Sequence, residues 1–155
     1  MPRTDTASRV IAASPRAVYQ AWLDPQALIS WLPPTGMTGR IDAFEPHVGG
    51  SYAMTLSYAD PATAGKTSAN ADTVHGRFTQ LIPDELIEQA VVFESPDPAF
   101  AGTMTISWTL TPVADGTEVT VRCTDVPAGI GRDDHETGIR STLQNLAEYL
   151  ETHIT

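Results

Sequence analysis

The sequence is poor in cysteine and in basic residues, and it has no long apolar run. One cysteine in 155 residues, Cys123, excludes an internal disulfide. Nine Lys and Arg against 19 Asp and Glu give a formal net charge of -10, which argues against nucleic acid and anionic membrane surfaces as partners. No stretch approaches the roughly 18 apolar residues of a membrane span, and no signal peptide is visible. We therefore expect a cytoplasmic protein without nucleic-acid or membrane partners.

Motifs of nucleotide, metal and nucleophile sites are also missing from the sequence. There is no G-x-S-x-G, no G-x-x-x-x-G-K, and no G-x-G-x-x-G after the first expected strand. The four histidines lack the i, i+4 spacing of a helical ligand pair: His47, His75, His135 and His153. The sequence thus predicts no metal site and no cofactor.

Local signals at the N-terminus predict a strand followed by two short helices. Residues 6–13 are β-branched in their middle and lead into Ser14 and Pro15, a capping hydroxyl followed by proline at the first helical position. Asp24 and Pro25 repeat this signal for a second short helix. The strand therefore precedes a pair of helices that ends before the prolines at residues 33–34.

From residue 38 to residue 126 the apolar pattern changes to a period of two. The alternation is clearest where Met104, Ile106, Trp108 and Leu110 share one face and threonines and Ser107 occupy the other. Short connections between the runs indicate antiparallel neighbours. Six strands are predicted in succession, at residues 38–45, 49–59, 72–82, 85–95, 103–113 and 117–126.

Residues 133–151 predict one long amphipathic helix. Its apolar stripe is formed by Ile139, Thr142, Leu143, Leu146, Tyr149 and Leu150. Asp133 and Glu136 have the D-x-x-E spacing of a capping box at the helix start. We predict an α+β fold in one domain, residues 1–155, with a curved antiparallel sheet wrapped around the C-terminal helix and two short helices after the first strand.

Five segments in this order resemble a known family: SPRAVYQAWLDP, WLPPTG, EPHVGG, HGRFTQLIPDELI and DHETGIRSTLQNLAEYLE. Together they resemble the helix-grip, START-like (SRPBCC) superfamily and, within it, the family named after the activator of the heat-shock-protein-90 ATPase. The resemblance implies a deep apolar cavity between sheet and long helix. Across the superfamily this cavity takes lipids, polyketides and other hydrophobic small molecules, and some relatives are cyclases or other enzymes.

Large side chains on faces that converge beneath the long helix are the candidate ligand contacts. They either fill a core or line a cavity, and as a set they suit a cavity better, with tyrosine hydroxyls to orient a ligand. His75 and Arg77 face solvent together or face inward together, and strand parity alone does not choose between these. The predicted ligand-binding residues are Trp31, Tyr52, Met54, Tyr58, His75, Trp108, His135, Ile139 and Leu143.

Two residues are candidates for acid–base catalysis. His135 lies in the first turn of the long helix, on its apolar side, where it either contacts a ligand or is a satisfied histidine at a helix end. Glu88, within the apolar run LIEQAVV, is a candidate buried carboxylate with a raised pKa. Cys123 faces the same side as Val121 and is expected to be an inert core thiol.

Three functions follow in order of preference. The first is binding of a small hydrophobic or aromatic molecule between the sheet and the helix. The second is a cyclase or hydratase type of reaction using His135, Glu88 or a cavity tyrosine. Activation of a chaperone ATPase is the third, because the family's namesake carries an additional N-terminal domain for that contact, whereas the fold predicted here begins near Thr6. A homodimer is compatible with this architecture, although no residue specifies one.

Overall fold

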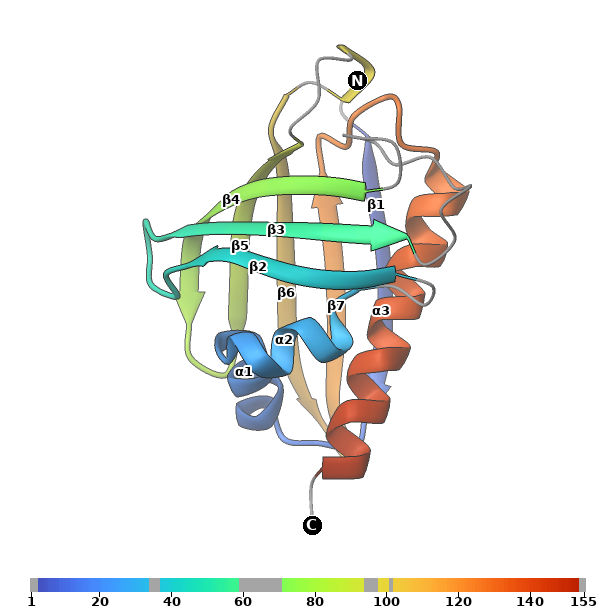
Figure 1. Cartoon of the computed structure of the whole chain (residues 1–155). Coiled ribbons are helices and arrows are strands. Elements are labelled where there is room, and N and C mark those ends of the chain that lie inside the picture. Colours follow the sequence, from blue (N-terminus) through green and yellow to red (C-terminus); the bar gives the residue numbers. More distant parts are fainter. Residues whose placement is uncertain (1–2, 34–36, 59–70, 94–97, 101, 154–155) are drawn as a thin grey trace.

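The computed structural model describes residues 3–33, 37–58, 71–93, 98–100 and 102–153, and it confirms the predicted helix-grip architecture (Figure 1). Two short helices follow the first strand, six more strands complete one sheet, and a long helix ends the chain. The elements are β1 (Thr4–Ile11), α1 (Pro15–Leu23), α2 (Pro25–Trp31), β2 (Met37–Phe44), β3 (Ser51–Tyr58), β4 (Ala71–Ile82), β5 (Leu86–Phe93), the 3-10 turn η1 (Pro98–Phe100), β6 (Met104–Val113), β7 (Gly116–Thr124) and α3 (Arg132–His153).

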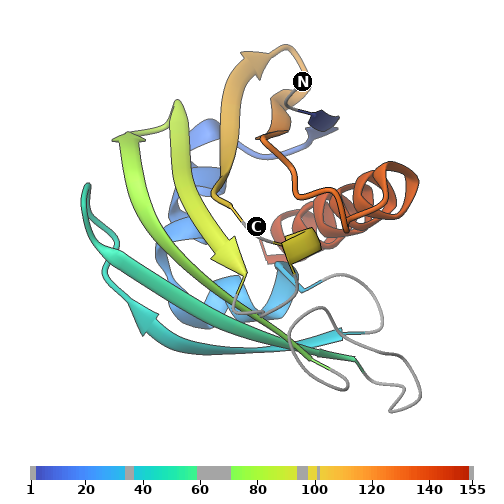
Figure 2. The same ribbon diagram turned by 90° about the horizontal axis from the view of Figure 1, so that it is seen from above.

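The seven strands form one antiparallel sheet in the order β1-β7-β6-β5-β4-β3-β2. Consecutive strands from β2 to β7 are neighbours, as short connections require, and β1 joins the meander beside β7. Seen from above, the sheet curls into an open half-barrel, and α3 lies on its open side (Figure 2). The two edge strands of the sheet are therefore β1 and β2.

Both short helices begin as their sequence signals predict. Ser14 Oγ accepts a hydrogen bond from the Ala17 N–H at 3.2 Å, and Asp24 Oδ1 accepts one from the Gln26 N–H at 3.0 Å. Pro15 and Pro25 occupy the first helical positions, where no backbone donor is needed. The immediate succession of α1 and α2 places them together across one end of the sheet (Figure 1).

The start of α3 differs from the prediction. The helix begins at Arg132, so Asp133 lies inside its first turn and does not cap it. Glu136 does not reach back to its own helix, because its Oε2 accepts the N–H of Thr6 in β1 at 3.2 Å. The predicted capping box is therefore wrong: the backbone donors of the edge strand lie beside α3 and take this carboxylate.

Side-chain hydrogen bonds fix the middle of α3 to the end of α2. Thr142 Oγ1 donates to the Leu32 carbonyl at 2.9 Å, and Asn145 Nδ2 donates to the Pro33 carbonyl at 3.0 Å. These carbonyls follow the last turn of α2, where no intrahelical donor remains for them. The contact holds α3 against the α1–α2 end of the fold.

The inner face of the sheet forms the core, as the period-two pattern predicts. The strand register aligns one row of cross-strand neighbours on this face, with one residue each from β4, β5, β6, β7 and β1. These are Phe78, Gln89, Ile106, Cys123 and Asp5. The neighbouring threonines and serines of β6 face outward and are more exposed than Met104, Trp108 and Leu110. Cys123 is 2% exposed, and burial raises the pKa of its thiol to about 12, which confirms an unreactive core cysteine.

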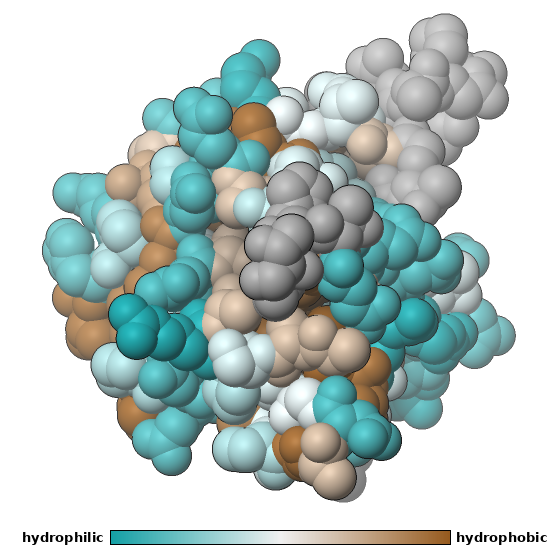
Figure 3. Space-filling model, turned by 90° about the horizontal axis from the view of Figure 1, so that it is seen from below, coloured by the Kyte–Doolittle hydropathy of each residue, from teal (hydrophilic) through white to brown (hydrophobic). Residues whose placement is uncertain are grey.

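Exposed large hydrophobic side chains are spread over several elements. On the face seen from below, brown side chains lie in several places separated by teal ones (Figure 3). Such scattered exposure is ordinary for a folded protein. The most exposed examples are Val10, Ile29, Val48, Ile82, Val92 and Val113.

Candidate functional site

An aromatic cluster occupies the interior between the short helices and the sheet. Trp22 lies at its centre, and its ring centroid is 5.5 Å from that of Trp108 and 5.8 Å from that of Trp31. Tyr52 and Phe78 complete the cluster at 6.3 and 6.4 Å from Trp22. Most of these ring pairs meet edge to face, the arrangement that the ring quadrupoles favour. Five elements, α1, α2, β3, β4 and β6, thus contribute to one apolar site.

Gly76 makes room for one of these rings. A Cβ at this position would lie 2.8 Å from Tyr52 Cδ1 and 2.9 Å from Val91 Cγ1, so only glycine accommodates Tyr52 in its observed position. Gly76 is the cross-strand partner of both Tyr52 and Val91. The tyrosine ring therefore packs where the neighbouring strand has no side chain.

Three hydrogen-bond donors in this interior have no oxygen or nitrogen acceptor among the residues that the structure describes. Trp22 Nε1 and Gln89 Nε2 are fully buried without a partner, and the Tyr52 hydroxyl contacts only Met54 Sδ, at 3.9 Å. All three residues lie around Phe78, since Trp22 and Tyr52 pack on its ring and Gln89 is its cross-strand partner. By contrast, Trp31 Nε1 donates to the Ala21 carbonyl at 3.2 Å.

The chemistry of these donors follows from their burial. Burial raises the pKa of Tyr52 above its usual 10.0, so the phenol stays protonated and serves as a donor, not a base, at neutral pH. Leaving a buried donor unpaired costs about 1–3 kcal/mol per group. The interior is therefore short of hydrogen-bond acceptors.

Most of the predicted ligand contacts meet in this interior. Their burial is consistent with the predicted inward faces of β3, β6 and α3. The side chain of Tyr58 lies outside the described residues. The predicted residues that are buried together are Trp31, Tyr52, Met54, Trp108, Ile139 and Leu143, with exposed fractions of 0 to 8%.

His75 and Glu88 lie on the outer face of the sheet, so the predictions of His75 as a ligand contact and of Glu88 as a buried carboxylate are wrong. His75 is exposed, between the inward-facing Val74 and Gly76, so it does not line the interior. Glu88 is half-buried on the outer face, where its carboxylate accepts from Thr79 Oγ1 at 2.9 Å and Ser107 Oγ at 3.2 Å. The physical reason is strand parity, because a shift of one residue moves a side chain to the opposite face.

His135 belongs to a cluster of polar side chains at the N-terminal end of α3. Its Nδ1 lies 2.7 Å from Asp5 Oδ2, and the same carboxylate is bound by Arg3 at 2.9 Å and by Arg132 at 3.2 Å. Asp5 is completely buried, whereas the His135 side chain is 17% exposed. This cluster joins β1 to the first turn of α3.

The Asp5 carboxylate is ionised in this cluster. Burial is the largest influence and opposes ionisation, but hydrogen bonds from His135 and Arg3 and their positive charges outweigh it, so the pKa of Asp5 lies below its usual 3.8. An ionised carboxylate only accepts hydrogen bonds, so His135 Nδ1 carries the hydrogen of this contact. No other hydrogen bond of the ring is made within the described part of the chain, which leaves Nε2 available.

Two residues of the interior were missed by the sequence predictions. Gln89 follows Glu88 and shares the parity of Ile87 and Val91, and this alternation was the signal that identifies it as inward-facing. Trp22 lies on the buried side of α1 with Val18 and Ala21, but nothing local marks its indole N–H as unpartnered. That property depends on residues of four other elements.

The described residues contain no group of three or more His, Cys, Asp or Glu side chains arranged to hold a metal ion. Among the described helices, none is both long and apolar enough to cross a membrane.

Known proteins of the same fold match almost the whole chain. A Chromobacterium violaceum protein of known crystal structure has 30% identity over 96% of both chains, with a TM-score of 0.84. A solution structure from Arthrobacter aurescens has 18% identity and a TM-score of 0.79, over 98% of this chain and 88% of that one. The AHSA1-like protein from Aeromonas hydrophila has 17% identity and a TM-score of 0.69, over 97% and 93% of the two chains. No curated protein matches the sequence.

The family model described as "Activator of Hsp90 ATPase homolog 1-like protein" matches residues 12–151, which span both short helices, six strands of the sheet and nearly all of α3. The chain therefore belongs to the Activator of Hsp90 ATPase homolog 1-like family.

Proposed function

We propose that the interior beneath α1 and α2 binds a small hydrophobic or aromatic molecule that carries a hydrogen-bond acceptor. The observation that supports this is the set of three buried donors around Phe78 without an acceptor, from Trp22, Tyr52 and Gln89. An acceptor oxygen, such as a ketone or ester carbonyl, pairs with a donor whose solvation was lost on folding. The apolar rings supply the remaining contact area.

The aromatic cluster suits a flat ligand. Ring faces and edges from α1, α2 and three strands surround the site, and offset or edge-to-face contacts with a ligand ring replace those made among the side chains. Met54 and Met104, which are 1% and 3% exposed, are unbranched and repack at low cost. Ligand entry therefore requires side-chain movement in the core, and not a change of fold.

The first test is native mass spectrometry of freshly purified protein, in which a co-purifying small molecule is expected. The second uses a matched pair of probes, acetophenone and ethylbenzene, which differ in one carbonyl acceptor. In 15N-resolved NMR titrations, acetophenone is expected to shift the Trp22 indole or Gln89 amide signal. It should bind about fivefold more tightly than ethylbenzene, because one net hydrogen bond is worth about 1 kcal/mol.

The variant Gln89→Leu is expected to reduce the preference for acetophenone, whereas Gln20→Leu, at an exposed position of α1, should leave it unchanged. The proposal fails if neither probe changes the signals of the aromatic cluster. If both probes bind equally and Gln89→Leu has no effect, the ligand needs no acceptor and this part of the proposal is wrong.

A second candidate function is acid–base catalysis by His135. What favours it is the hydrogen bond to Asp5, which orients the imidazole through Nδ1 and leaves Nε2 for a substrate. Once a co-purifying molecule is identified, its chemical conversion is measured with the wild-type protein and with His135→Gln. Conversion by the wild type that is lost in His135→Gln supports catalysis by His135. Equal binding with no chemical change in either protein would leave His135 a purely structural residue.

A further inference from the structure

The edge of β1 that faces away from β7 lies beside α3. The N–H of Thr6 donates to Glu136 Oε2 at 3.2 Å, and the N–H of Ala12 donates to Glu151 Oε2 at 3.1 Å. Both glutamates belong to α3, so the helix covers the edge at two points with carboxylates. The edge strand thus already binds two anionic groups through its backbone.

Between these two points, the strand edge has no carboxylate. β1 pairs with β7 in unbroken register from Thr4 to Ile11, so N–H directions alternate regularly along it. The amides of Ser8 and Val10 therefore point to the same side as that of Thr6, away from β7. No side chain of the described residues bonds to them.

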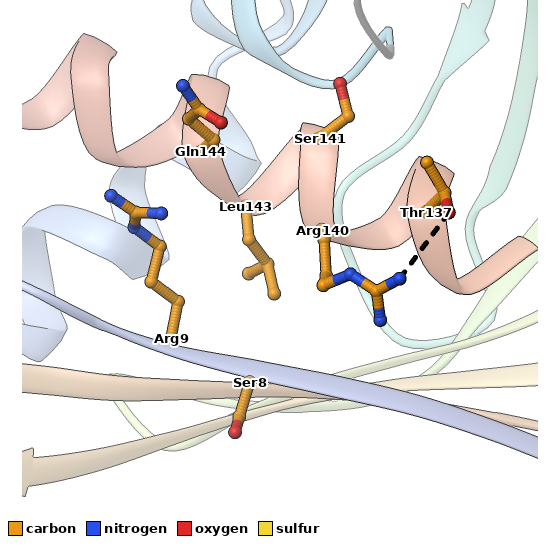
Figure 4. A pocket seen from close by; sticks show the side chains of 7 residues that line it. All are labelled: Ser8, Arg9, Thr137, Arg140, Ser141, Leu143 and Gln144. Carbon is orange, nitrogen blue, oxygen red and sulfur yellow. Dashed lines mark hydrogen bonds between the residues drawn. The ribbon is translucent and has the colours of Figure 1, made fainter. Parts of the chain in front are cut away.

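A groove lies alongside this stretch, between β1 and α3. Its volume is about 450 Å³, and Ser8 and Arg9 form one wall while Arg140 and Gln144 belong to the other. Figure 4 shows Arg9 extending from β1 toward the helix and Arg140 extending from α3 toward the strand, with Leu143 between them. The two guanidinium groups thus approach the groove from opposite walls. We call this site the β1–α3 groove.

Neither arginine has an acidic partner within the described residues. Within the described part of the chain, Arg140 Nη2 contacts only Thr137 Oγ1, at 3.4 Å, and Arg9 makes no side-chain hydrogen bond or ion pair. Three acidic side chains of α3 accept hydrogen bonds from other groups, since Glu136 and Glu151 bind backbone amides of β1 and Glu148 accepts from Gln144 at 3.2 Å. In a chain of net charge -10, the groove thus holds two guanidinium groups that have no acidic partner among the described residues.

We propose that the β1–α3 groove binds an oxyanion, a phosphate or carboxylate group, between Arg9 and Arg140. Guanidinium groups bind such anions through paired, charge-assisted hydrogen bonds. The free amide of Ser8 and the hydroxyl of Thr137 add neutral donors on the two walls. This site contains no residue of the aromatic cluster and does not depend on ligand binding there.

The test is a 15N NMR titration of the full chain with inorganic phosphate and with succinate, at constant pH and ionic strength. Saturable shifts are expected at the Ser8 and Val10 amides and at the arginine Nε–H signals of the groove. Arg9→Gln and Arg140→Gln should each weaken binding roughly tenfold, because each removes a charge-assisted contact. A response to phosphate alone identifies a phosphate site, and a response to succinate alone identifies a carboxylate site.

The matched control is Arg122→Gln, which removes an exposed arginine from β7, outside the groove. It should bind like the wild-type protein. All three variants replace exposed side chains, and unchanged amide spectra without ligand verify their folds. Non-saturating shifts at every arginine, or wild-type binding by Arg9→Gln and Arg140→Gln, would overturn the proposal.

Discussion

The aromatic interior and the β1–α3 edge treat their polar groups in opposite ways. In the interior, Trp22 and Gln89 are fully buried and leave donors unpaired among apolar rings. At the edge, the buried Asp5 carboxylate is bound by Arg3, Arg132 and His135, and glutamates of α3 bind amides of β1. The edge therefore stabilises the fold with polar contacts, whereas the interior keeps unpaired donors, which the proposed ligand would pair with.

The largest expected effect comes from removing the centre of the aromatic cluster. Trp22→Ala should lower the free energy of unfolding by about 3–5 kcal/mol, because it leaves a cavity among four rings. Guanidinium-induced unfolding followed by circular dichroism measures it. Ile29→Ala, at a 40% exposed position of α2, is the control and should change stability by less than about 0.5 kcal/mol. A small effect of Trp22→Ala would mean that the interior is loosely packed.

The next effect tests the charged cluster at the edge. Asp5→Asn should cost about 2–3 kcal/mol, since it leaves the donors of Arg3, Arg132 and His135 facing a neutral amide. Asp115→Asn makes the same change at an exposed turn position and should be nearly neutral. Equal effects of the two substitutions would contradict a stabilising role for the cluster.

The same cluster predicts a pH dependence. The pKa of Asp5 is lower in the folded protein than its usual 3.8, so the folded state binds this proton less readily than the unfolded chain. Its contribution to stability is complete above the unfolded pKa and is lost as the pH falls through the folded pKa. Acid unfolding profiles should therefore fall more steeply below about pH 4 for the wild type than for Asp5→Asn. Parallel profiles would show that other carboxylates dominate.

An effect of opposite sign is expected in the interior. Gln89→Leu removes an unpaired buried amide and should raise the free energy of unfolding of the ligand-free protein by about 1 kcal/mol. Thermal unfolding without ligand measures this gain, with Gln20→Leu as the exposed control. Destabilisation would show that the Gln89 amide is satisfied in solution, and would weaken the proposed acceptor site.

The smallest effect concerns the covered strand edge. Glu136→Gln retains the shape of the side chain but weakens its hydrogen bond to the Thr6 amide, so a loss of about 0.5 kcal/mol is expected. Hydrogen exchange of the Thr6 amide should become faster, while that of Ala12, bound by Glu151, should not change. Equal protection in both proteins would mean that Glu136 does not hold this edge.

Local features of the fold were predictable because their causes are local. Ser14 and Asp24 cap the helices that follow them, and the alternation around Trp108 identifies the inner face of β6. The backbone likewise requires the adjacent glycines before β3, since Gly49 has φ +85° and a Cβ at Gly50 would meet the Glu45 carbonyl.

The sequence predictions were wrong where strand parity sets the direction of a side chain or where its hydrogen-bond partner is distant in the sequence. His75 and Glu88 were assigned to an interior from which their strand parity excludes them, and Gln89, one residue away, is the inward-facing polar group. Asp5 and His135 are separated by 130 positions, so no spacing in the sequence reveals their 2.7 Å contact. Glu136 differs from the prediction for the same reason. Donors of its own helix and of a remote strand compete for its carboxylate, and the Thr6 amide of β1 binds it.

The order of elements, the caps of the short helices and the apolar side of most strands can be read from the amino-acid sequence, because these depend on neighbours within a few residues. Which polar groups are paired depends on the folded chain. The tertiary structure placed Arg3, Arg132 and His135 against Asp5, left Trp22 and Gln89 without acceptors among the described residues, and brought Arg9 opposite Arg140. Hydrogen bonding at a given residue depends on which distant groups the curled sheet and the long helix bring within about 3 Å of it.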